Sequence, residues 1–310
     1  MSLGFVFPGQ GSQSVGMTSE LSQSFSCVKE TFEEGSDVLG YDLWSLVENG
    51  PAETLNQTDK TQPALLASSV AIWRIWQKQG LPQPTLLAGH SLGEYSALTC
   101  SGAISYADAI RVVSLRGQFM QNSVPEGKGA MAAVLGLADS AVIKVCESAA
   151  EGQILSAVNF NSPGQVVIAG EVEAVNRAVE LAKEAGAKRA LLLRISVPSH
   201  CELMKPAAEK LAETLKGIEL SAPQIPIIHN VNVGSTQNVY EIRELLVQQL
   251  YSPVRWVETI QQFADAGINH IIECGPGKVL MGLNKRIVKG LPTIAVYDEA
   301  TLEKASLALS

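Results

Sequence analysis

The stretch Gly89-His90-Ser91-Leu92-Gly93 constrains this chain more than any other part of its sequence. The apolar run 85–88 before it predicts a strand, and residues 94–98 after it predict the first turns of a helix. Gly-x-Ser-x-Gly between a strand and a helix is typical of a nucleophile elbow, a strained turn that presents the serine hydroxyl. Side chains at the glycine positions would collide with the neighbouring strand and helix. We therefore predict that Ser91 is a nucleophile beside the N-terminus of the following helix.

Composition excludes several classes of protein. A length of 310 residues suits one large domain or two smaller ones, and a formal charge of −8 argues against nucleic acid as a partner. The 5 cysteines are scattered and form no Cys-x-x-Cys pair, which favours free thiols over disulfides or a metal site. The N-terminus resembles no signal peptide, and no apolar run approaches the ~20 residues of a membrane helix. We expect a cytoplasmic protein that uses neither a membrane nor a metal.

The order of expected elements divides the chain into a discontinuous large domain and an insertion. Alternating helices and strands in residues 1–124 and 197–310 predict a mostly parallel sheet covered on both faces. Residues 125–196 predict the order β-α-β-β-α-β, the ferredoxin-like split unit, with boundaries near Pro125 and Ser196. The expected fold is therefore α/β, with an inserted ferredoxin-like small domain. The insertion's strands are expected at 130–135, 154–160, 165–169 and 189–195, and its helices at 139–150 and 171–185.

Elsewhere the pattern predicts two long helices. One covers residues 18–39 and ends at Gly40; the other opens at Thr61, carries Pro63 in its first turn and runs to about residue 79. The tail from Asp298 carries no clear pattern.

The general base must be one of 4 histidines. His90 adjoins Ser91 on a sharp turn, where adjacent side chains diverge, so it is a poor base but a plausible pocket wall. His229 and His270 lie at expected strand ends. His200 follows Pro198-Ser199 in the loop that returns from the insertion, and it comes after the serine, as an α/β-hydrolase-like order requires. We place His200 first and His229 second; no acidic third member stands out, which leaves a backbone carbonyl as a candidate partner.

Two further features have both a structural and a functional interpretation. The loop Pro8-Gly9-Gln10-Gly11 follows a first strand at residues 3–7 and is either a tight turn or a source of backbone N–H groups. Arg116 lies on an otherwise apolar helix, where a buried guanidinium needs an anionic partner. That partner is either an internal carboxylate or a ligand.

Taken together, the motifs resemble those of the malonyl-CoA:acyl carrier protein transacylases, and they span almost the whole chain in the expected order. The matching stretches are residues 7–13, 61–64, 89–94, 116–117, 161–165, 198–200, 249–254 and 273–277.

The resemblance implies a ping-pong malonyl transfer from malonyl-CoA to the phosphopantetheine thiol of acyl carrier protein, for fatty acid synthesis, by a monomer and without a bound cofactor. It implies Ser91 as nucleophile and His200 as base. The remaining implied roles are an oxyanion hole from the backbone N–H groups of Gln10 and Leu92, a main-chain carbonyl of Gln249 that orients His200, and an acyl pocket with Arg116, Gln62 and His90.

Three rival interpretations remain open from the sequence. A serine thioesterase or esterase would share the nucleophile and the base, but it would need neither the arginine nor the insertion. A stand-alone acyltransferase for polyketide synthesis would share every motif. A non-catalytic carrier-binding protein would not need Ser91, His200 and Arg116 together.

Overall fold

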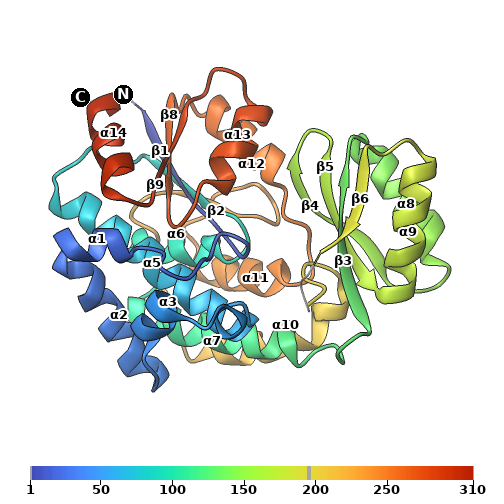
Figure 1. Ribbon diagram of the computed structural model, residues 1–310, viewed down its shortest axis with the longest axis horizontal. Helices are drawn as coiled ribbons and strands as arrows, with labels where there is room; N and C mark the ends of the chain where they lie inside the picture. The colour runs from blue at the N-terminus through green and yellow to red at the C-terminus, as the bar shows by residue number, and fades with distance from the viewer. Residues whose placement is uncertain (1, 194–196, 310) are drawn as a thin grey trace.

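A computed structural model describes residues 2–193 and 197–309 and contains two separate sheets in two lobes (Figure 1). The larger lobe is built on a parallel sheet with the strand order β7-β2-β1-β8-β9. Its strands are β1 (Leu3–Phe7), β2 (Leu86–Gly89), β7 (Ile227–Ile228), β8 (His270–Cys274) and β9 (Thr293–Val296).

The central strand β1 is buried on both faces, which explains its continuous apolar sequence. Leu3, Phe5 and Phe7 belong to the main core on one face of the sheet. Val6 belongs to a second core on the other face, together with Trp256. Because all these strands are parallel, the loops after β1, β2 and β7 emerge at the same edge of the sheet.

Helices cover both faces of the parallel sheet, and α5 packs against α2 and α7 (Figure 1). Before the small sheet come α1 (Ser19–Ser24), α2 (Ser26–Leu39), α3 (Leu43–Asn49), α4 (Ala52–Leu55), α5 (Thr58–Lys78), α6 (Gly93–Cys100) and α7 (Tyr106–Gln121). After it come η1 (Glu202–Met204), α10 (Lys205–Lys216), α11 (Val239–Gln249), α12 (Trp256–Asp265), α13 (Val279–Ile287) and α14 (Glu299–Leu309).

Three helix predictions are corrected. The helix expected over residues 18–39 is two helices, because Phe25 is extended between them. Helix α5 begins at Thr58, earlier than expected, so Pro63 lies inside it and not in its first turn. The tail from Asp298, for which no element was expected, forms α14, whose Leu302 and Leu309 pack into the main core.

The smaller lobe is an antiparallel sheet with the strand order β4-β5-β3-β6, as Figure 1 shows. Residues from α8 and α9 form a core with one face of it. Met131, Val158 and Val167 lie on the other face with Cys201, which comes from the large lobe. The elements are β3 (Gly129–Leu135), α8 (Asp139–Ala150), β4 (Leu155–Ser162), β5 (Gln165–Glu171), α9 (Val172–Glu184) and β6 (Arg189–Leu192).

Backbone hydrogen bonds join the two lobes. Phe160 N–H on β4 donates to Val254 O at 3.0 Å, and Val254 N–H donates to Val158 O at 2.8 Å. The expected return of the chain near Ser196, with the end of the expected strand 189–195, lies outside the described residues. Among the helices that are described, none is long and apolar enough to cross a membrane.

Candidate active site

Ser91 sits in a sharp turn between β2 and α6, in the left-handed region with φ of 51°. The two flanking glycines are required by contact. A Cβ on Gly89 would lie 1.8 Å from the carbonyl carbon of Gly93, and a Cβ on Gly93 would lie 2.0 Å from Phe7 O. Any side chain at either position would therefore collide with the backbone, as the sequence predicts. The two glycines allow the sharp turn that presents the Ser91 hydroxyl.

His200 is the histidine that contacts Ser91. Its Nε2 lies 2.8 Å from Ser91 Oγ, and its Nδ1 lies 2.7 Å from the backbone carbonyl of Gln249. A carbonyl can only accept, so Nδ1 carries the ring hydrogen and Nε2 is free to take the serine proton. The imidazole is buried, and its backbone also adopts a positive φ, 67°, with its N–H donating to Leu250 O at 2.9 Å. The arrangement can activate a serine without a carboxylate.

The other candidate bases lie elsewhere. His229 is fully buried and contacts Glu94, 2.7 Å from Nδ1 to Oε1. His270 begins β8 at the opposite edge of the sheet. His90 points Nε2 to Asn161 Oδ1 at 2.8 Å, with its ring centroid 5.4 Å from that of Trp256. Burial lowers the pKa of the His90 imidazole, so it lines the pocket as a neutral group.

The electrostatics of the site keep His200 unprotonated. Burial lowers the pKa of the His200 imidazole to about 3, and the Arg116 guanidinium acts in the same direction. A lowered pKa means that the neutral form persists as the pH falls below the ordinary range of histidine.

This pKa predicts the pH dependence of acylation. We expect kcat/KM for the acyl donor to stay level as the pH falls from about 8 to about 5, because kcat/KM reports the free enzyme's base and His200 stays neutral there. Steady-state rates across this range, corrected for any loss of folded protein, provide the measurement. An acid limb centred near the ordinary histidine pKa of about 6.5 would contradict the assignment.

Arg116, on α7, is 1% exposed, and its guanidinium reaches Ser91. Its Nη2 donates to Ser91 Oγ at 3.3 Å and to Gln249 Oε1 at 2.9 Å, and its Nη1 donates to Gln62 Oε1 at 2.9 Å. Burial lowers the pKa of Arg116, but a guanidinium remains charged at neutral pH. Within the described residues no carboxylate pairs with Arg116. Its partners are neutral oxygens, and the internal ion pair considered from the sequence is not formed there.

Backbone donors for an oxyanion come from two loops at the same sheet edge. A Cβ on Gly9 would lie 2.5 Å from His90 O, so the loop carrying Gln10 packs directly against the turn carrying Ser91. The Ser91 N–H already donates to Asn230 Oδ1 at 2.8 Å. The N–H groups of Gln10 and Leu92 are therefore the better candidates for that role.

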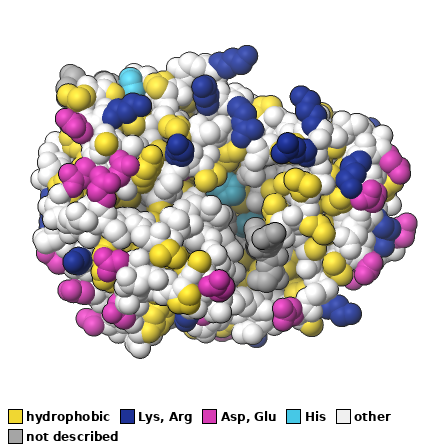
Figure 2. Space-filling view, viewed as in Figure 1, with side chains coloured by type: hydrophobic (Ala, Val, Ile, Leu, Met, Phe, Trp, Pro, Cys, Tyr) yellow, Lys and Arg dark blue, Asp and Glu magenta, His cyan; other side chains and the backbone are white. Residues whose placement is uncertain are grey.

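A cavity brings together seven of the eight residues predicted for the site, and Gln249 lies behind it. Figure 2 shows histidine side chains at the floor of a depression between the two lobes. The cavity is lined by Gln10, Gln62, His90, Ser91, Leu92, Arg116, Met120, Met131, Asn159, Ser199 and His200.

Sequence reasoning missed part of this lining. Met131 on β3 and Asn159 on β4 come from the small sheet and close the cavity on that side, and Met120 lies near Gln62. Nothing local in the sequence marks Met131 and Asn159, because only the packing of the two lobes brings them to the site. Within the described residues, no group of His, Cys, Asp and Glu side chains could hold a metal ion.

A family model and individual relatives both identify this chain as an acyl transferase. The acyl transferase domain family matches residues 4–300. The malonyl CoA-acyl carrier protein transacylase of Salmonella typhimurium is 58% identical over 301 residues, with 97% of each chain covered. The chain belongs to the malonyl CoA-acyl carrier protein transacylases. The family inferred from the motifs is confirmed, and the protein is an acyltransferase.

Solved structures of transacylases share the fold. An acyl carrier protein S-malonyltransferase from Vibrio cholerae is 60% identical, with a TM-score of 0.97 over 98% of this chain and 100% of that one. PlMCAT, a malonyl-transacylase in complex with the type II PKS acyl-carrier protein AntF, is 57% identical, with a TM-score of 0.98 over 99% of this chain and 100% of that one. The mixed α/β architecture with a parallel and a separate antiparallel sheet is therefore that of solved transacylases.

Proposed function

We propose that this protein transfers a malonyl group from malonyl-CoA to the phosphopantetheine thiol of acyl carrier protein, through a malonyl ester on Ser91. The observation that carries the proposal is the distance of 3.3 Å between Arg116 Nη2 and Ser91 Oγ. A buried guanidinium this close to a nucleophile, with neutral partners throughout the part of the chain that the structure describes, suits an acyl group that ends in a carboxylate. Full-length similarity to malonyl transacylases supports the same substrate.

In the first half-reaction, Ser91 Oγ attacks the thioester carbonyl while His200 Nε2 takes the hydroxyl proton. The oxyanion accepts hydrogen bonds from the N–H groups of Gln10 and Leu92. When the C–S bond breaks, the CoA thiolate takes the proton from His200 and leaves as a thiol. The Gln249 carbonyl holds the imidazole in the tautomer that both proton transfers need.

In the second half-reaction, the carrier's thiol gives its proton to His200 Nε2 and attacks the ester carbonyl. The C–O bond breaks, and the proton returns to Ser91 Oγ. Ser91 and His200 thereby return to their starting protonation states, and the proposed steps involve no bound cofactor. During both halves Arg116 holds the malonyl carboxylate, with Gln62 and His90 beside it.

We also infer the finer architecture. The large domain is α/β-hydrolase-like and comprises residues 1–124 and 197–310, and the small domain, 125–196, is ferredoxin-like. The order β3-α8-β4-β5-α9-β6 and the sheet order β4-β5-β3-β6 support this division. A monomer in the cytoplasm fits a carrier-dependent enzyme of this size.

Fatty acid chain elongation is the proposed pathway, and a polyketide carrier is the second candidate. The latter is favoured by one observation, since a relative 57% identical to this chain binds a type II PKS carrier. Transfer rates to a fatty acid carrier and to a polyketide carrier, measured with the same malonyl-enzyme, would rank the two.

Intact-protein mass spectrometry after mixing with malonyl-CoA alone tests the proposal. We expect one malonyl adduct, mapped to Ser91, which persists in water and moves to holo acyl carrier protein when that is added. An adduct that disappears without a thiol acceptor would indicate a thioesterase. The absence of any adduct would overturn the proposed function.

A further inference from the structure

A buried glutamate lies behind the nucleophile, and the proposed mechanism does not use it. Glu94, on the first turn of α6, has no exposed surface. Its Oε1 accepts from His229 Nδ1 at 2.7 Å, and its Oε2 accepts from the Asn230 N–H at 3.2 Å and from Gln249 Nε2 at 2.7 Å. Burying a carboxylate costs free energy unless hydrogen-bond donors surround it. We therefore expect the donors around Glu94 to keep their positions.

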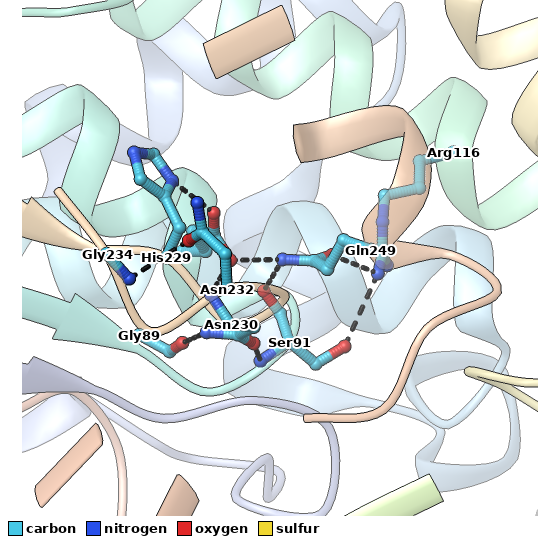
Figure 3. Close-up of polar contacts among 9 residues, drawn as sticks. Gly89, Ser91, Arg116, His229, Asn230, Asn232, Gly234 and Gln249 are labelled. Carbon is cyan, nitrogen blue, oxygen red and sulfur yellow. Dashed lines mark hydrogen bonds and ion pairs between the residues drawn. The ribbon is translucent and has the colours of Figure 1, made fainter. Parts of the chain in front are cut away.

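Gln249 connects this carboxylate to the acyl pocket. In Figure 3 its side chain lies between Arg116 on one side and the group of His229 and Asn230 on the other. Its Nε2 donates to Glu94 Oε2 and, at 3.1 Å, to Ser91 O, while its Oε1 accepts from Arg116 Nη2 at 2.9 Å.

The Glu94 carboxylate and the Arg116 guanidinium together decide which way the Gln249 amide faces. A carboxylate can only accept and a guanidinium can only donate, so the amide nitrogen must face Glu94 and the oxygen must face Arg116. The reverse orientation would place oxygen against oxygen at one end and N–H against N–H at the other. The same residue orients His200 through its main-chain carbonyl.

This arrangement also leaves the charge of Arg116 available. A carboxylate in direct contact would neutralise the guanidinium and compete with an acyl carboxylate. Here one amide separates Glu94 from Arg116, and the guanidinium donates to neutral oxygens of Gln62, Gln249 and Ser91.

We propose that Glu94 is a positioning residue for acyl selectivity: acting through the Gln249 amide, its carboxylate aims the Arg116 guanidinium at the acyl group without neutralising it. The inference rests on the proposed function, since it requires an acyl group with a terminal carboxylate. It predicts that losing the Glu94 charge changes selectivity, which a purely structural role would not do.

The test compares malonyl-CoA with acetyl-CoA. In Glu94→Gln the isosteric side chain can turn an N–H toward Gln249 and so release the amide. We expect the ratio of kcat/KM for malonyl-CoA to that for acetyl-CoA to fall about 10- to 100-fold, the range for losing a hydrogen bond to a charged group. The same substitution in an Arg116→Ala background should change this ratio little, because the two residues act through one path.

Glu273→Gln is the matched control. Glu273 is also fully buried, but it accepts from the backbone N–H groups of Leu280 and Met281 at the start of α13. Its substitution should lower thermal stability and leave the selectivity ratio unchanged. If Glu94→Gln does not fold, Gln249→Leu removes the relay and keeps the main-chain carbonyl for His200, and the same fall in the ratio is expected.

A loss of rate in Glu94→Gln with an unchanged ratio would overturn the inference. If that variant does not fold, an unchanged ratio in Gln249→Leu would do so. These results differ from a failure of the proposed function, in which the unaltered protein itself forms no malonyl adduct.

Discussion

Ser91→Ala is expected to abolish the malonyl adduct and to lower transfer to acyl carrier protein by roughly 10⁴-fold or more, because the covalent route disappears with the nucleophile. The substitution removes one oxygen that contacts His200 and Arg116 and leaves the turn's glycines in place. The folded protein should therefore remain. Intact-protein mass and the rate of malonyl transfer from malonyl-CoA provide the measurement.

Ser199→Ala is the matched control, because Ser199 lines the same cavity and adjoins His200 in the chain. Within residues 2–193 and 197–309, its hydroxyl has a single hydrogen-bond partner, the nearby Val197 carbonyl at 3.4 Å, so we expect a small change in rate and an intact adduct. An adduct that persists in Ser91→Ala and maps to another residue would contradict the assignment.

Arg116→Ala is expected to lower kcat/KM for malonyl-CoA by roughly 10²- to 10⁴-fold, which corresponds to about 3–5 kcal/mol for one partner of a buried charged pair. Uncharged donors such as acetyl-CoA should lose far less, because they never contact the guanidinium. Parallel kinetics with the two donors measure the change. Without the guanidinium the pKa of His200 should rise, so the acid limb of kcat/KM should move to higher pH.

Arg116→Lys tests whether geometry matters as well as charge. Lysine keeps the positive charge but cannot donate to Gln62, Gln249 and an acyl carboxylate from one planar fork, so we expect only partial recovery. Equal losses for malonyl-CoA and acetyl-CoA in Arg116→Ala would mean that the arginine is structural and that the proposed carboxylate site is wrong.

The contact between Ser91 and His200 could be predicted because the signals for both residues are local. Glycine is required on both sides of Ser91, because in the structure a Cβ on Gly89 would collide with the next turn and a Cβ on Gly93 with the strand that ends at Phe7. His200 stood out by its loop position and by its order after the serine. The roles of Gln10, Leu92 and Gln249 came only from the resemblance to a family, and they remain proposals that the geometry supports.

Helix ends and the tail were predicted less well. Phe25 interrupts the helix expected over 18–39, although its sequence neighbours favour continuation. Helix α14 was not predicted because its apolar pattern is short. The helix is stabilised by the packing of Leu302 and Leu309 against the main core, which the local sequence does not show. In both cases tertiary contacts outweigh a weak local preference.

The sequence by itself determined the strained turn at Ser91, the alternation of strands and helices, and the family. Steric exclusion at glycine and the periodicity of apolar residues act over a few neighbouring positions, so a single chain displays them. Tertiary structure alone decided that Arg116 has neutral partners, that Glu94 stands one amide behind it, and that Met131 and Asn159 close the cavity. The direction of a hydrogen bond and the charge around a buried group depend on residues more than 100 positions apart, such as Glu94 and Gln249 at a separation of 155. Only the folded chain brings such residues into contact.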